Sequence, residues 1–418
     1  VTRQPARRIM DSWIFQKGYP LVSASIPEDG STISLSQDRF LYTEGETADS
    51  TIWSVPIVLK VGTSSGVEEV RYLLEEKSAE VKLDSPADWA TANAGGSGFF
   101  RARYSAEMLK SLSSTMFDNL TPIERYGLVD DTWSSVMAGR TSASGFLDFA
   151  RSFQPETDLD VWTVLSGCLT GLEKLVEGEA KEQFQASIRD LAQPAMDRLG
   201  WEPSDSDSSR DLELRGLFIR LLANVGDDAL AQKNARDMHD SYLVDAGSAE
   251  PNVVAAATGV VASHGDSAQY EVFLDKHHNP STPQEERRYQ SALAAFPGEV
   301  EMERTLAMTL DGTIRTQDAP YLLAVAMRNK EHGHLAWEFI KDNWDQVNKD
   351  FPSNSIVRML SGVTSLSKPE QAADVIAFFD DHEVPQGQLT LQQTLEKLRV
   401  NVALRERESE PFSQSLTS

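Results

Sequence analysis

Cysteine and long apolar runs are nearly absent from this sequence, and each shortage excludes a class of protein. A single cysteine, Cys168, among 418 residues excludes an internal disulfide framework and a cysteine-based zinc site. Its neighbours form an apolar helical pattern, which favours a buried inert thiol over a nucleophile. So little cysteine fits a reducing cytoplasm, where we expect the protein. No apolar run approaches the roughly 18 residues that a membrane-spanning helix needs.

Positive charge is also in short supply. The chain has 39 Lys and Arg against 64 Asp and Glu, for a formal net charge of −25. Such a chain repels nucleic-acid phosphates and anionic membranes, and no local run of basic residues compensates for this. We therefore expect neither a nucleic acid nor a membrane as a partner.

Known catalytic motifs are missing as well. The only His-Glu pair, His382–Glu383, has no second histidine at the spacing of the helical zinc motif H-E-x-x-H. The pairs at 332–334 and 277–278 are poorly spaced for shared metal ligation, which favours a surface position. No phosphate-binding glycine loop or nucleophile elbow occurs. We therefore expect no catalytic and no metal-binding residue in this chain.

The opening residues show the pattern of a short amphipathic helix. Its apolar residues lie on one helical face: Ile9, Met10, Trp13 and Ile14. Gly18 stands where a left-handed residue closes a helix, and Pro20 prevents its continuation. This helix is either a surface helix of the fold or the last helix of a domain outside the sequence.

Residues 21–104 alternate between apolar and polar side chains, which predicts six or seven short strands. The turn at 27–30 joins the first two strands in a hairpin, and the glycines of 93–98 predict a second hairpin turn. Pro56 indicates an edge position. A small β-sandwich satisfies this pattern.

From Ser105 onward the apolar period becomes helical and stays so to the end of the chain. Thr121, Pro122 and Glu124 form a helix start with a capping box. Short polar breaks separate the helical stretches, which we place at 121–139, 142–153, 158–174, 178–199, 209–223, 227–243, 251–263, 267–278, 283–295, 299–309, 318–328, 332–349, 354–364, 368–381 and 387–406. Paired helices of this length predict a HEAT-like α-α superhelical solenoid.

The predicted protein is therefore multidomain and mostly α, with a small β-sandwich before the solenoid. Its expected domains are a terminal helix at 1–20, a sandwich at 21–104 and a helical domain at 105–418. A stand-alone scaffold for protein–protein interaction is compatible with this architecture, because solenoids serve several purposes.

Two groups of motifs resemble a known family. In order, the first group comprises Trp13, Gln16 and Gly18–Pro20; Gln37 with Arg39–Phe40; Trp53 with Pro56; Asn93, Gly98, Arg101 and Tyr104; and Arg125 with Asp130–Asp131. The second lies within 286–347 and includes "IRTQD" and "LAWEFIKDNWD". Together they resemble the region that follows the catalytic domain in zinc aminopeptidases of the aminopeptidase N type, a gluzincin class.

The resemblance implies a non-catalytic C-terminal region whose parent holds zinc and removes N-terminal residues from peptides. It implies that the zinc motif lies in a catalytic domain preceding Val1, which would be the partner of this region. The helical domain would close over the catalytic cleft and shape the access of peptide substrates.

Three polar residues of "IRTQD" are candidate contacts to the distal part of a peptide: Arg315, Gln317 and Asp318. Arg315 has the geometry to hold a carboxylate by a bidentate pair. Alternatively, 316–318 cap the next helix and Arg315 pairs with a neighbouring acid. The first helix discriminates between an enzyme fragment and a scaffold, because a fragment exposes the apolar face of residues 9–14.

Overall fold

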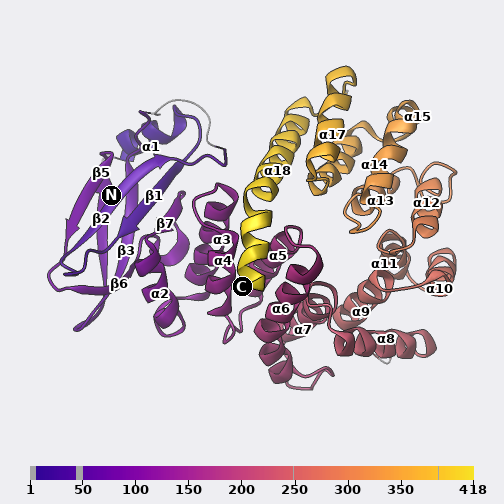
Figure 1. Ribbon diagram of the computed structural model, residues 1–418, viewed down its shortest axis with the longest axis horizontal. Helices are drawn as coiled ribbons and strands as arrows, with labels where there is room; N and C mark the ends of the chain where they lie inside the picture. Colours follow the sequence, from indigo (N-terminus) through magenta and orange to yellow (C-terminus); the bar gives the residue numbers. More distant parts are fainter. Residues whose placement is uncertain (1–5, 44–49, 248, 385) are drawn as a thin grey trace. The chain divides into compact units, whose positions relative to one another are not determined.

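The computed structural model describes residues 6–43, 50–247, 249–384 and 386–418. It is mostly helical with a small sheet region near the N-terminus, which confirms the predicted class at that level (Figure 1). The chain forms two compact units, Val1–Leu172 and Glu173–Ser418, which we call the N-terminal and C-terminal units. The predicted domain limits at 20 and 104 stay predictions, and residues 1–5 lie outside the described part.

The N-terminal unit contains two sheets. A four-stranded sheet has the order β5-β2-β1-β7, and a three-stranded sheet has the order β4-β3-β6. The strands are β1 (Pro20–Ser25), β2 (Thr32–Arg39), β3 (Val55–Thr63), β4 (Gly66–Leu74), β5 (Ser78–Lys82), β6 (Ala87–Thr91) and β7 (Arg101–Tyr104). Alternate residues of β2 and β3 are buried, as one core-facing side of each strand requires.

The first predicted hairpin is confirmed. β1 and β2 pair in antiparallel register from Pro20↔Arg39 to Ser25↔Ser34. Gly30 closes the turn with a φ of 65° and donates its N–H to the carbonyl of Pro27 at 2.9 Å. A left-handed backbone at this position favours glycine because other residues pay a steric penalty there.

The second predicted hairpin is wrong. The glycine-rich turn, which includes η1 (Ala94–Gly96), leads from β6 in one sheet to β7 in the other, where β7 runs parallel to β1. The edge position of Pro56 is also wrong for its strand, since β3 is the central strand of its sheet. The proline is tolerated because pairing with β6 begins only at Lys60.

Helices follow the strands of the N-terminal unit. Thr121 and Glu124 form the predicted capping box at the start of α3, with Pro122 as its first residue. The helices that begin in this unit are α1 (Ala6–Ile14), α2 (Ala106–Asn119), α3 (Pro122–Met137), α4 (Ala143–Arg151) and α5 (Leu159–Glu173).

Helices are the regular secondary structure of the described residues of the C-terminal unit, and turns and loops connect them. Its helices are α6 (Gly178–Leu199), α7 (Ser209–Arg220), the π-helix η2 (Leu221–Val225), α8 (Ala229–Val244), α9 (Pro251–Ser263), α10 (Ser267–His278), α11 (Pro283–Leu293), α12 (Glu299–Ala307), α13 (Ala319–Ala326), α14 (Gly333–Asp342), α15 (Trp344–Asp350), α16 (Ser353–Met359), the 3-10 helix η3 (Leu360–Ser365), α17 (Pro369–Asp381) and α18 (Gln388–Thr417).

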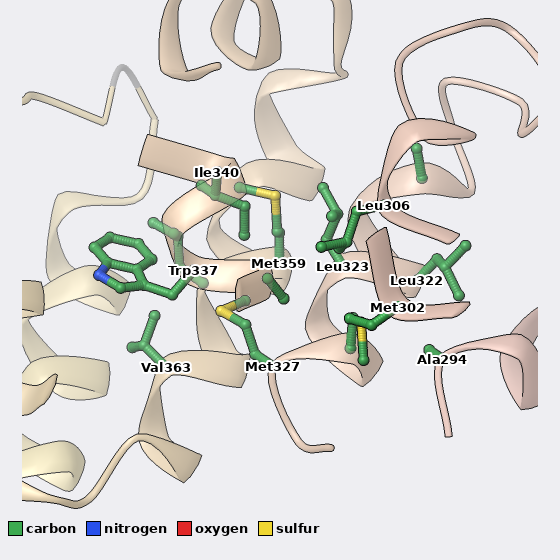
Figure 2. Close-up of a cluster of buried hydrophobic side chains, with 14 of the residues drawn as sticks. Ala294, Met302, Leu306, Leu322, Leu323, Met327, Trp337, Ile340, Met359 and Val363 are labelled. Carbon is green, nitrogen blue, oxygen red and sulfur yellow. The ribbon is translucent and has the colours of Figure 1, made fainter. Parts of the chain in front are cut away.

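The core of this unit is a continuous apolar cluster. Met327 and Met359 lie near Trp337 in this cluster, and Met302 lies farther along it beside Leu322 (Figure 2). Methionine suits such a place because its flexible thioether fills irregular gaps. The last helix, α18, returns to the first, α6, where the buried rings of Phe184 and Phe412 lie 6.0 Å apart.

Candidate functional site

A group of cations gathers in the C-terminal unit from three distant parts of the chain. Lys174 directly follows α5, Arg328 and Lys330 follow α13, and Arg405 lies in α18. The positive charges of Arg328, Lys330 and Arg405 repel that of Lys174. We call these four residues the cationic cluster.

Lys330 is anchored by two acceptors. Its Nζ donates to Oε1 of Glu173 at 2.5 Å and to the carbonyl oxygen of Asn224 at 2.8 Å. Asn224 belongs to the π-helix η2, a rare conformation that occurs frequently at functional sites. The Glu173 side chain is almost fully buried, and the bond that it accepts comes from Lys330.

Lys174 has no hydrogen-bond or ion-pair partner among the described residues. Desolvation by the surrounding protein lowers its pKa, Glu173 opposes this, and Arg405, Arg328 and Lys330 lower the pKa further. The side chain is nevertheless exposed. An amine that is both exposed and desolvated stands in crowded surroundings that a ligand can reach.

The two arginines of the cluster are weakly engaged. Arg328 reaches Oγ of Ser361 at 3.5 Å, and Arg405 reaches Oγ of Ser367 at 3.3 Å. Desolvation lowers the pKa of Arg405, which Glu177 and Glu370 oppose. Cations with unused hydrogen-bond donors can bind an anion. A guanidinium can hold a carboxylate by two parallel hydrogen bonds.

The described residues form no group of side chains that could bind a metal ion, and the histidines and the cysteine considered as reactive groups are accounted for as follows. No three His, Cys, Asp or Glu side chains gather there as a possible metal site. His239 is buried against Tyr289, 3.0 Å from its hydroxyl oxygen, and burial lowers its pKa to about 4. His277 is buried, contrary to the predicted surface position. Cys168 is buried as predicted, and desolvation raises its pKa.

The predicted contact residues lie between α12 and α13. Arg315 pairs with Glu286 and, at 3.3 Å, with Asp318. Asp318 occupies the cap position of α13 without a capping side-chain bond, and Gln317 is exposed. The alternative in which Arg315 pairs with a neighbouring acid therefore has direct support, while a role in binding peptide stays a prediction.

Sequence reasoning missed the cationic cluster. Its members are scattered over more than two hundred residues, and the largest local signal is "RNK" at 328–330. No periodicity or spacing connects Lys174 to Arg405, because their proximity depends on the return of α18 to the start of the unit.

Comparison with known proteins identifies the family. A family model described as "ERAP1-like C-terminal domain" matches residues 89–400. The chain belongs to this family. It is 29% identical to aminopeptidase M1 of Arabidopsis thaliana over 95% of the chain and 47% of the relative. It is 26% identical to endoplasmic reticulum aminopeptidase 2 of Bos taurus over 95% of the chain and 43% of that relative.

Puromycin-sensitive aminopeptidase of Caenorhabditis elegans is 26% identical over 80% of the chain and 36% of its own length. The chain thus spans less than half the length of these curated relatives. The predicted resemblance to the C-terminal region of aminopeptidases is confirmed. In the described part of the chain, no helix combines the length and apolar character that crossing a membrane demands.

Several of the motif residues on which the resemblance rests have a structural role in this chain. The Gln37 side chain accepts the N–H of Trp53 and donates to its carbonyl, both at 2.9 Å. The Asn93 side chain likewise accepts from and donates to the backbone of Gly98. These amides replace missing ladder bonds where the backbone leaves a strand, since buried backbone groups must be paired.

The charged motif residues are paired as well. The Arg101 side chain is 23% exposed and bonds both Asp130 and Asp131. Burial alone would lower its pKa, but these carboxylates raise it. Arg125 forms a bidentate pair with Glu156 at 2.6 and 2.9 Å. These residues stabilise the N-terminal unit and leave no free charge for a ligand.

Proposed function

We propose that this chain is the non-catalytic C-terminal region of a zinc-dependent aminopeptidase that removes N-terminal residues from peptides. Its helices, arranged as a HEAT-like solenoid, would close over the catalytic cleft and shape the access of substrate. The cytoplasm is the proposed location, based on the single cysteine.

The observation that carries a peptide-holding role is the surplus charge of the cationic cluster. A bound peptide ends in a carboxylate, and Lys174 and Arg328 together offer unused donors for one. Retaining unpaired like charges is unfavourable for folding, so a ligand is the simpler reason for their presence. Arg315 is a second candidate for the same role, although its two acidic partners compete with substrate.

Zinc belongs to the proposed parent and not to these residues. The described side chains form no group of three His, Cys, Asp or Glu that could hold it, so the donor set here does not fit the ion. We therefore derive no chemical step through zinc and assign the catalytic residues to another part of the parent.

The scaffold alternative is less well supported because of the first helix. Met10 and Ile14 of this helix have exposed fractions of 53% and 64%, and Phe15, which follows it, has 80%. Trp13 of the same helix is fixed by a hydrogen bond to the Ser54 carbonyl at 3.1 Å. The exposed apolar side chains suit contact with a catalytic domain.

Zinc content and aminoacyl-anilide hydrolysis test the proposal. Both are measured on this chain and on the gene product extended upstream of Val1. We expect only the extended protein to bind zinc and cleave. If neither does, the scaffold alternative replaces the enzyme.

The peptide-holding role is tested by Lys174→Glu and Arg328→Glu in the extended protein. Loss of a charge-assisted bond worth about 1.5–3 kcal/mol raises KM for long peptides about 10-fold or more. Hydrolysis of aminoacyl anilides, which lack a distal carboxylate, stays unchanged. Lys349→Glu, an equal charge reversal on α15, is the matched control. Unchanged KM in both cluster variants would remove this role.

A further inference from the structure

The N-terminal unit contains a cavity that is separate from the cationic cluster and is lined by both cationic and apolar side chains. It has a volume of about 800 Å³ and lies among the end of β7, the helix α2 and the helix α4. We call it the β7–α2–α4 pocket. Arg103, Lys110 and Arg140 supply its positive charge, and Leu109 and Phe149 supply apolar surface.

The charge of this pocket is opposite to that of the whole chain. Asp148 is the one acid among its lining residues, and it pairs with Arg151 at 2.5 Å. Arg140 is held in place, because its guanidinium donates to the Leu41 carbonyl at 3.0 Å and lies over the Phe40 ring. A local positive excess within a chain of net charge −25 selects anionic ligands.

Two cations of the pocket differ from three of its serines in their bonding. Ser113, Ser114 and Ser152 each donate their hydroxyl hydrogen to a carbonyl of their own helix or its end. Arg103 and Lys110, by contrast, have no hydrogen-bond or ion-pair partner in the described part of the chain. These two side chains therefore offer charged donors to the polar part of a ligand, such as a carboxylate.

A bare anion would not fill the space. Pockets for drug-sized ligands measure about 300–1,000 Å³, and this one lies in the upper part of that range. A second depression of about 530 Å³, lined by serines of β1, β2 and β5 and by Glu80, shares Arg103, Tyr104 and Ser105 with it. Through these shared residues the two depressions adjoin each other at β7 of the four-stranded sheet.

We propose that the β7–α2–α4 pocket binds a short acidic peptide segment in extended form. Its acidic side chains would pair with Arg103 and Lys110, and an apolar side chain would contact Leu109 and Phe149. The site lies entirely in the N-terminal unit, so this binding does not depend on the proposed aminopeptidase activity of a parent protein.

The test is fluorescence anisotropy on the full 418-residue chain. The probe is the blocked peptide acetyl-Leu-Glu-Asp-Phe-Glu-amide with a dye of zero net charge, and its counterpart has Gln and Asn in place of the acids. We expect the acidic peptide alone to bind, with affinity falling between about 50 and about 300 mM salt as surface charges are screened. Equal binding of both peptides, or none by either, overturns the proposal.

Variants locate the binding. We expect the double variant Arg103→Glu, Lys110→Glu to weaken Kd about 10-fold or more, since each charge-assisted bond contributes about 1.5–3 kcal/mol. The milder pair Arg103→Gln, Lys110→Gln serves if the reversal disturbs folding. Lys82→Glu makes one such charge reversal on β5 outside the pocket and should leave Kd within about 2-fold. Loss of binding in Lys174→Glu with retention in the double variant would assign the peptide to the cationic cluster and overturn the proposal.

Discussion

The motif arginines of the N-terminal unit and the cationic cluster of the C-terminal unit use their charges in opposite ways. In the N-terminal unit, the motif residues Arg101 and Arg125 are largely buried against carboxylates. In the C-terminal unit, Lys174 stands exposed among other cations without a bonded partner. The comparison teaches that recurring motif residues here maintain the fold, whereas the charges left over for binding carry no motif.

The largest effect we predict is at the buried pair of the N-terminal unit. Arg125→Met leaves Glu156, which is fully buried, without its cation. Breaking such a pair costs about 3 to 5 kcal/mol of unfolding free energy, which urea unfolding measures. Arg151→Met, at an exposed pair with Asp148, is the control and should cost less than about 1 kcal/mol. Equal losses in the two variants would contradict the framework role.

The next effect is a dependence of stability on pH. The folded pKa of His239 is about 4, against about 6.5 in the unfolded chain. Below pH 6.5 the unfolded state therefore binds the extra proton, and stability is lost as pH falls from about 6.5 to about 4. The loss from this residue is about 3 kcal/mol at most.

Unfolding of His239→Gln across this pH range isolates that contribution. Burial also lowers the pKa of His264 and His277, so the wild-type slope exceeds that of one group. We expect the variant to have a shallower slope than the wild-type protein. A slope unchanged in His239→Gln would show that this histidine is not neutral in the folded protein.

A smaller change in unfolding free energy is expected at Lys174, and it should be close to zero or opposite in sign to the loss at Arg125. Lys174→Met removes an exposed cation from a group of like charges, so the unfolding free energy should stay within about 0.5 kcal/mol or rise slightly. The same substitution should raise KM for long peptides in the extended protein. A clear loss of stability would mean that Lys174 belongs to the framework, as Arg125 does.

A similarly small effect on stability is expected at Arg315. Its pairs with Glu286 and Asp318 are solvent-exposed on the arginine side, so Arg315→Ala should change stability by less than about 1 kcal/mol. KM for long peptides in the extended protein decides its role. An unchanged KM would remove Arg315 from the candidate contacts, and an increase comparable to that of Lys174→Met would place it beside the cluster in function.

Local signals predicted much of the fold. The capping box of Thr121 and Glu124, the turn at Gly30 and the helices 178–199, 251–263 and 267–278 all agree with the structure. Each depends on interactions within a few residues, which sequence spacing encodes directly.

The failures share one cause, which is dependence on partners distant in sequence. A glycine turn reads the same whether the next strand joins its own sheet or another, so the passage from β6 to β7 could not be distinguished from a hairpin. Nothing near His277 showed that other helices would bury it. The cationic cluster and the β7–α2–α4 pocket likewise exist only after the helices have packed.

The return of α18 to α6 has a consequence for biosynthesis. Phe184 leaves the ribosome more than two hundred residues before its partner Phe412, an interval of roughly 10 to 45 s at ordinary rates of translation. During that time the start of the C-terminal unit must persist with an uncovered aromatic surface, which chaperones bind. A premature stop before α18 would therefore leave an incomplete unit in which the Phe184 ring of α6 lacks its contact with Phe412.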